Sequence, residues 1–190
     1  MQDLKRAALL LLFLTVLTGV VYPLAVTAVA QVVMPSAANG SLITVDGKVV
    51  GSTLVGQGFT DPKHFWTRPS ATGPSGYDGA ASSGSNQGPL NEALLDAVRR
   101  RVAALVDADP QHRTPVPVDL VTASASGLDP HVSVAGARYQ VARVAAARGL
   151  SPDAVQTLVD RHTKGRDLGV LGEPRVNVLE LNLALDAMPR

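Results

Sequence analysis

Residues 7–33 read AALLLLFLTVLTGVVYPLAVTAVAQVV, a run without a single charged side chain. A helix rises about 1.5 Å per residue, so residues 7–30 alone reach about 36 Å, more than the roughly 30 Å hydrocarbon core of a bilayer. The run therefore predicts a transmembrane anchor helix. Pro23 is compatible with such a helix.

The composition of this run limits what the helix can do. It contains no Asp, Glu, Lys, Arg or His, so it offers no ion pathway of its own. Thr15 and Gly19 form a small-xxx-small pair, which allows a second helix to approach closely. We therefore expect the helix to be an anchor that packs against other membrane segments.

Charge placement predicts the orientation of the chain. Lys5 and Arg6 directly precede the run, and the next cation is Lys48. By the positive-inside rule, residues 1–6 are expected to be cytoplasmic. Residues 34–41 then form a short linker, and residues 42–190 a single domain outside the cytoplasm. The chain is expected to cross the cytoplasmic membrane once.

An alternative interpretation of the N-terminus is a cleaved signal peptide. Lys5 and Arg6 resemble a basic n-region, and Ala28-Val29-Ala30 resembles an A-x-A cleavage pattern. The protein would then be a secreted binding module or hydrolase released by cleavage after Ala30. The apolar run is longer than the 7 to 15 residues typical of a signal peptide, which favours the anchor.

Composition narrows the function classes. The 190 residues carry 17 Lys and Arg against 16 Asp and Glu, a net charge of +1. Such a balance argues against a nucleic-acid binder, which needs a basic surface to neutralise phosphates. The sequence has no cysteine, which excludes disulfides and thiolate metal sites.

From residue 42 onward the patterns predict a mixed α+β domain. Residues 42–45 and 48–55 flank Asp46-Gly47, a strong hairpin turn signal. Apolar residues recur at threes and fours over residues 91–107, which predicts an amphipathic helix. Further expected elements are a helical turn that begins at residues 60–62 and carries residues 64–66, a strand at 118–121, a helix from 133 to 148 ended by Gly149, and a helix from 151 to 163.

Two segments are less regular or ambiguous. Residues 72–89, TGPSGYDGAASSGSNQGP, have no apolar period and predict a long loop that is either functional or disordered. Residues 176–186 alternate as a strand does, yet Val178, Leu181 and Leu185 also fit a helix. Asn177 and Glu180 resemble a capping box, so a helix after a short strand is favoured.

Catalytic and ligand-binding motifs are incomplete. Ser124, Ser126, Asp129 and His131 lie close in sequence, but no G-x-S-x-G motif accompanies them, and these residue types often tie down turns. The four histidines are scattered without metal-ligand spacing. The Gly-rich loop lacks the G-K-[ST] ending of a phosphate-binding loop.

Several short motifs follow one another in a characteristic order. They are GSTLVGQGF at 51–59, FWTRPSA at 65–71, SGSNQGPLN at 83–91, PVPVDLVTASASGLDPH at 115–131, QVARVAAAR at 140–148 and GEPRVNVLELN at 172–182. Together they resemble the C subunit (KdpC) of the bacterial high-affinity potassium-transporting P-type ATPase over nearly the whole chain. One departure is Ser83, where the family pattern usually shows glycine.

The resemblance implies a non-catalytic subunit needed for assembly and activity of an ATP-driven potassium uptake complex in the bacterial cell (inner) membrane. The implied partners are a channel-like, potassium-binding A subunit and an ATP-hydrolysing B subunit. The family is described as a catalytic chaperone that raises the ATP affinity of the B subunit. No cofactor is implied for the chain alone, and ATP enters only within the complex. With the domain outside the cytoplasm, such an effect must travel through subunit contacts.

We therefore expect the helix to pack on the transmembrane subunits and the external domain to rest over the ion entrance of the A subunit. Six polar residues in the motifs are candidate partner contacts, with the alternative that they only hold loops together. They are Gln57, Arg68, Ser70, Asn86, Asp129 and His131.

Overall fold

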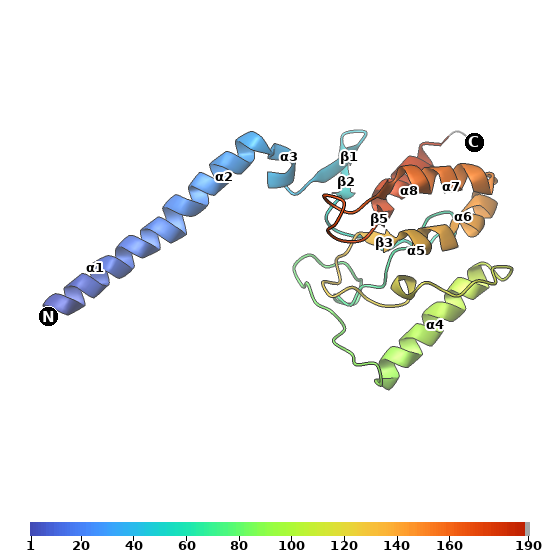
Figure 1. Cartoon of the computed structure of the whole chain (residues 1–190), viewed down its shortest axis with the longest axis horizontal. Helices are drawn as coiled ribbons and strands as arrows, with labels where there is room; N and C mark the ends of the chain where they lie inside the picture. The colour runs from blue at the N-terminus through green and yellow to red at the C-terminus, as the bar shows by residue number, and fades with distance from the viewer. Residues whose placement is uncertain (189–190) are drawn as a thin grey trace. The chain divides into compact units, whose positions relative to one another are not determined.

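The computed structural model describes residues 1–188 and divides into two compact units, Met1–Val50 and the chain from Gly51 onward. The first unit holds an N-terminal apolar helix, and the second mixes short helices with short strands (Figure 1). The expected α+β class, with one long apolar helix at the N-terminus, is therefore confirmed.

The N-terminal helix runs from Gln2 to Val33 through α1 (Gln2–Val16), η1 (Leu17–Val21) and α2 (Tyr22–Val33). It buries none of its side chains. Among the described residues it is the one helix long and apolar enough to cross a membrane. An apolar helix without a protein partner of its own is suited to lipid or to neighbouring membrane helices.

A π-helical turn interrupts this helix just before Pro23. A proline has no N–H to donate, and its ring clashes with the carbonyl four residues earlier, which here belongs to Gly19. The turn at Leu17–Val21 lets the Tyr22 N–H donate to the Leu17 carbonyl, five residues back. The helix therefore widens where the proline would otherwise break it. Gly19 lies in this turn, with open space where a Cβ would stand.

A helical turn and a hairpin follow. The residues expected to form a linker include the single turn α3 (Pro35–Ala38). The predicted hairpin is confirmed as β1 (Leu42–Val45) and β2 (Lys48–Ser52). Asp46 and Gly47 both have positive φ, 50° and 76°, as a type I′ turn requires.

The second unit is built around a small antiparallel sheet of order β3-β5-β4, in which Val176 pairs with both Val132 and Thr163. In Figure 1, α5 and α6 lie between α4 on one side and α7 and α8 on the other. The elements are α4 (Glu92–Ala108), η2 (Val118–Leu120), β3 (His131–Ser133), α5 (Val134–Tyr139), α6 (Val141–Arg148), α7 (Pro152–Arg161), β4 (Thr163–Lys164), β5 (Arg175–Asn177) and α8 (Val178–Asp186).

Side-chain caps explain where four of these helices begin. Asn91, Ser133, Ser151 and Asn177 each precede a helix and accept a hydrogen bond from a backbone N–H in its first turn. Such caps satisfy donors that have no partner within the helix. The ambiguity at residues 176–186 is thereby resolved as the favoured alternative, a short strand followed by a helix.

Two predicted elements were wrong. Residues 118–121 are not a strand: Val118–Leu120 form the 3-10 helix η2, because the Leu120 N–H turns back to the Pro117 carbonyl and the Thr122 hydroxyl donates to the Val118 carbonyl. The helix expected over residues 133–148 is two helices, separated at Gln140, whose side chain bonds a distant backbone segment. The end at Gly149, in the left-handed conformation, was correct.

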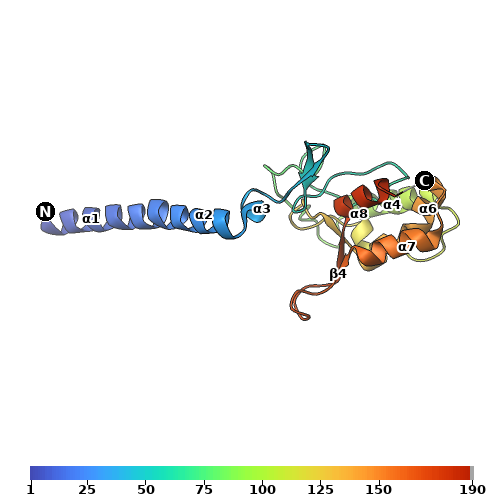
Figure 2. The same ribbon diagram turned by 90° about the horizontal axis from the view of Figure 1, so that it is seen from above.

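The remaining connections are loops. Residues 72–89 contain no helix or strand, as expected. The helical turn expected to begin at residues 60–62 is a single turn over residues 61–64, closed by the His64 N–H on the Asp61 carbonyl, and it ends before Phe65. Residues 165–174, between β4 and β5, project away from the helices (Figure 2).

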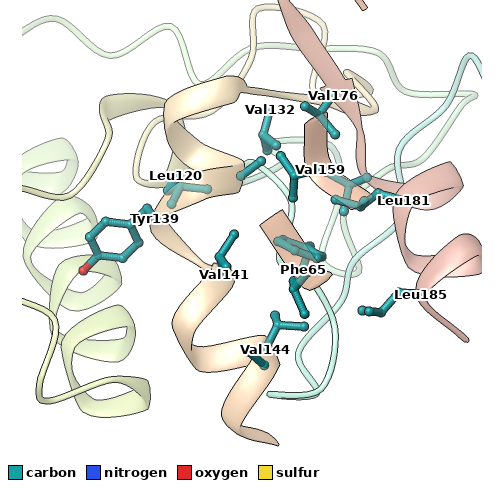
Figure 3. Close-up of a cluster of buried hydrophobic side chains, with 14 of the residues drawn as sticks. Phe65, Leu120, Val132, Tyr139, Val141, Val144, Val159, Val176, Leu181 and Leu185 are labelled. Atoms are coloured by element: carbon teal, nitrogen blue, oxygen red, sulfur yellow. The ribbon is translucent and has the colours of Figure 1, made fainter. Parts of the chain in front are cut away.

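The hydrophobic core lies between the sheet and helices α5 to α8. Phe65, which comes from a segment without regular structure, is fully buried among Val144, Val159 and Leu181 (Figure 3). Burying side chains of this size contributes about 1.5–3 kcal/mol each. The core therefore ties an irregular segment to the helices.

Candidate functional site

The structure brings four of the six candidate residues to one junction, where residues 68–77 meet residues 123–131. They are Arg68, Ser70, Asp129 and His131. The junction joins segments about sixty positions apart in the sequence. Its hydrogen bonds run mostly between side chains and backbone.

Asp129 is the centre of this junction. Its Oδ2 accepts from Arg68 Nη1 at 3.0 Å, and its Oδ1 accepts from the His131 backbone N–H at 3.0 Å and lies 3.2 Å from His131 Nδ1. Partial burial raises the pKa of Asp129, but the hydrogen bonds from His131 and the charge of Arg68 outweigh it and lower the pKa below its usual range. Asp129 is therefore a stable carboxylate at neutral pH.

Ser70 connects the same two segments through its hydroxyl. The hydroxyl donates to the Gly127 carbonyl at 2.7 Å and accepts from the Tyr77 N–H at 2.8 Å. The Tyr77 hydroxyl in turn donates to the Arg68 carbonyl at 2.5 Å. Burial raises the pKa of Tyr77, so this donor keeps its proton.

The Gly/Ser-rich loop packs tightly on the same turn. A Cβ on Gly127, which has a φ of +68°, would lie 2.4 Å from Thr72 Cγ2 and 2.6 Å from the Ser83 carbonyl oxygen. A Cβ on Gly84 would lie 2.9 Å from the Ala125 carbonyl oxygen. The Ser83 N–H donates to the Ser126 carbonyl at 3.0 Å. Glycine is thus required where the two backbones approach closely.

The other two candidates lie elsewhere. The Gln57 side chain fills the space that a Cβ on Gly51 would occupy, next to Leu179, and the backbone carbonyl of Gln57 accepts from the Thr67 hydroxyl. Asn86 is exposed and left-handed, with a φ of 51°, and none of the junction's hydrogen bonds involves it.

The serine and histidine residues considered for catalysis are engaged in local turns. The Ser124 hydroxyl accepts from the Gly127 N–H and the Ser126 hydroxyl from the Leu128 N–H. These are the contacts of turn-forming serines rather than of a nucleophile beside a base. Among residues 1–188, no three His, Asp or Glu side chains gather as metal ligands.

Sequence reasoning missed a second set of polar residues, which is more deeply buried. Asn182 accepts from the Phe65 N–H and donates to its carbonyl, and Gln140 does the same for Trp66. The Arg143 guanidinium lies 4.3 Å from the centroid of the Trp66 ring, and burial lowers its pKa to about 10. Their positions within the motifs at residues 65–71, 140–148 and 172–182 were the only indication in the sequence that they matter.

An open groove of about 630 Å³ runs beside the junction. It is lined by Leu54, Arg68 and most of residues 124–130. Its lining combines apolar side chains with the Arg68–Asp129 ion pair, which the hydrogen bonds of the junction hold in place. Such an arrangement suits contact with another protein better than chemistry on a small molecule.

Comparisons with known proteins point to one family. The family model described as "KdpC: K+-transporting ATPase, c chain" matches residues 4–187. The chain is 61% identical over 187 residues to the potassium-transporting ATPase KdpC subunit of Dechloromonas aromatica, covering 98% of both chains. It is 64% identical over 186 residues to the subunit of that name from Sorangium cellulosum, again covering 98% of both.

Proposed function

Because the chain belongs to the KdpC family and is thus an accessory subunit of a membrane potassium-transporting ATPase, we propose that it is non-catalytic and required for assembly. In this proposal it holds together a channel-like A subunit, which conducts potassium, and a B subunit, which hydrolyses ATP. The observation that carries the proposal is the helix from Gln2 to Val33, which buries no side chain within its own chain. Such a helix gains its packing from lipid or from other subunits.

Deletion of residues 1–33 tests this assembly role. Co-purification of the A and B subunits with the truncated chain is expected to fall strongly relative to the full chain. The truncated chain must be exported by a cleavable signal so that it reaches the same compartment. Normal retention of both subunits would contradict the role of the helix.

We place the N-terminus in the cytoplasm and the second unit outside it. Lys5 and Arg6 before the span, and the uncharged stretch up to Val45, support this orientation. The chain has no cysteine, so Ser41→Cys introduces a single reporter. We expect an impermeant thiol reagent to label it in whole cells, with outer-membrane access controlled where present. Labelling only after the cytoplasmic membrane is opened would contradict the orientation.

The proposed effect on ATP is indirect. The Gly/Ser loop lacks the G-K-[ST] ending with which a phosphate-binding loop contacts phosphates and magnesium, and its Ser83 N–H is already bonded to the Ser126 carbonyl. The chain alone is therefore expected to bind no nucleotide by calorimetry. The assembled complex is expected to need less ATP for half-maximal hydrolysis than the A and B subunits without this chain. Equal requirements would contradict the chaperone role.

The external unit is proposed to dock on the A subunit over its ion entrance, with the groove at Leu54 and residues 124–130 as one contact surface. The balanced charge of the chain supports contact with protein rather than direct capture of potassium.

The competing function, a secreted module released after Ala30, is distinguished by the mass of the mature protein. A mature protein that begins at Gln31 would support it, and an intact N-terminus supports the anchored subunit.

A further inference from the structure

The loop between β4 and β5 ends in an apolar tip formed by Leu168, Val170 and Leu171. Their exposed fractions are 89%, 71% and 57%, the values of side chains that contact little of their own chain. Figure 2 shows this loop extending away from the helices of the second unit. Three exposed aliphatic side chains within four positions form a patch that folding does not explain.

The tip is held in a fixed shape. The N–H of Asp167 donates to the Leu171 carbonyl at 2.8 Å, and the N–H of Leu171 donates back at 2.9 Å. Arg166 bonds both carboxylate oxygens of Glu173 at 2.8 Å, and Arg175 bonds Asp167 at 2.8 Å. The apolar side chains are thus presented on a braced hairpin and are kept from folding back on the domain.

Leu168 adopts a conformation that leucine normally avoids. Its φ is +54°, in the left-handed region, where a branched side chain is strained and Gly, Asn or Asp is preferred. A leucine here costs stability and gains almost no burial in return. Strain of this kind, retained at an exposed position, points to a use outside the folded chain.

We propose that this tip inserts into an apolar pocket on a partner subunit of the potassium-transporting ATPase, an inference that rests on the proposed assembly function. The charges around the tip favour protein over lipid. Loops that enter a membrane surface carry several unmatched basic residues. Here Arg166 pairs with Glu173, and Arg175 and Lys164 share Asp167, so that residues 164–175 have a net charge of only +1. An apolar centre bordered by mostly paired charges is the usual anatomy of a protein interface.

Leu168→Asn in the full chain tests this insertion. Asn tolerates the left-handed conformation, so the thermal stability of the purified chain is expected to be unchanged or raised. Retention of the partner subunits during purification of the complex is expected to fall about tenfold, as for truncation of one central apolar side chain. Leu90→Asn is the matched control, because Leu90 is 90% exposed, and it should leave retention unchanged. Normal retention with Leu168→Asn would overturn the proposal, as would an equal loss with the control.

Photocrosslinking gives a second measurement that does not depend on affinity. A photoreactive p-benzoyl-phenylalanine in place of Val170 is expected to form a covalent adduct with another subunit in membranes holding the whole complex, and the same residue at Leu90 is not. An adduct with lipid alone, or none, would overturn the proposal. If the chain is needed for assembly while the tip variants behave normally, only this inference fails. If assembly proceeds without the chain, the proposed function itself fails.

Discussion

The N-terminal helix, Gln2 to Val33, and the irregular stretch from residue 53 to residue 91 differ in how their backbone N–H and carbonyl groups are hydrogen-bonded and in how far their side chains are buried. The helix satisfies its backbone internally and buries no side chain. The irregular stretch contains no helix or strand, yet Phe65 and Thr72 are at most 1% exposed. Its backbone is satisfied by distant side chains, among them Asn182 and Gln140. Order without regular structure thus depends on specific polar residues elsewhere in the chain.

The largest expected effect is on the free energy of unfolding, when a phenylalanine is truncated in each of the two stretches. Phe65→Ala removes a fully buried ring and is expected to lower the free energy of unfolding by about 3–5 kcal/mol. Phe13→Ala, in the apolar helix, is expected to leave the unfolding of the second unit unchanged, because Phe13 is 60% exposed in the chain. Denaturant unfolding of the full chain in detergent measures both. Equal losses would contradict the comparison.

The next effect concerns the hydrogen bonds that the Asn182 side chain makes with the backbone of Phe65. Asn182→Leu keeps the number and branching of the side-chain heavy atoms but leaves the Phe65 N–H and carbonyl unpaired in the core. The expected loss of unfolding free energy is about 2–4 kcal/mol, since each buried unsatisfied group costs about 1–3 kcal/mol. Asn39→Leu is the control, because the Asn39 amide bonds Gln31 at an exposed position. A neutral Asn182→Leu variant would show that the amide is dispensable.

A pair of glycines tests the close packing of residues 72–83 against the turn at Gly127. Gly127 and Gly149 share a φ of +68°, but only Gly127 has atoms near the place of a Cβ. Gly149→Ala is expected to cost about 1 kcal/mol from the backbone alone. Gly127→Ala should cost about 2 kcal/mol or more, because Thr72 and the Ser83 carbonyl must also move. Thermal unfolding of the two variants compares them, and equal costs would remove the packing argument.

The smallest expected effect depends on pH. The pKa of Asp129 is lowered in the folded chain, so its contribution to stability is present above the pKa of the unfolded state, about 3.9, and is lost as the pH falls through the lower folded value. Asp129→Asn is therefore expected to cost less than about 1 kcal/mol at pH 7. Unfolding at pH 7 and below pH 3 measures the difference, which should disappear in acid. A difference that persists in acid would contradict the ionic contribution.

The sequence was sufficient where the signal is local. Asn91, Ser151 and Asn177 marked helix starts, Asp46-Gly47 marked the hairpin, and Gly149 marked a helix end. Each of these depends on one residue's own backbone preference or its reach to the next turn. The long apolar helix was predicted from composition alone, since backbone bonding in lipid must be internal.

Prediction from the sequence failed where a residue's conformation depends on a hydrogen-bond partner far away in the chain. Residues 118–121 are apolar enough for a strand, but Asp119 accepts from both the backbone N–H and the hydroxyl of Ser133, which favours a compact turn. Gln140 interrupts a helix because it bonds Trp66, seventy-four positions away. Arg68 and Ser70 were named as candidates, yet only the fold pairs them with Asp129 and Gly127. The tip at Leu168 to Leu171 gave no periodic signal at all.

The wide turn at Leu17–Val21 has a geometric consequence for anything that lies alongside the helix. It accommodates one extra residue, so every position after it is displaced by about 100° around the axis relative to an unbroken helix of the same length. A straight neighbour that follows Thr15 on one half will meet a different column of side chains on the other. Removing a single residue from this turn would bring the side chains of the two halves back into line. A neighbouring surface shaped to the present rotation would then fit only one half of the helix.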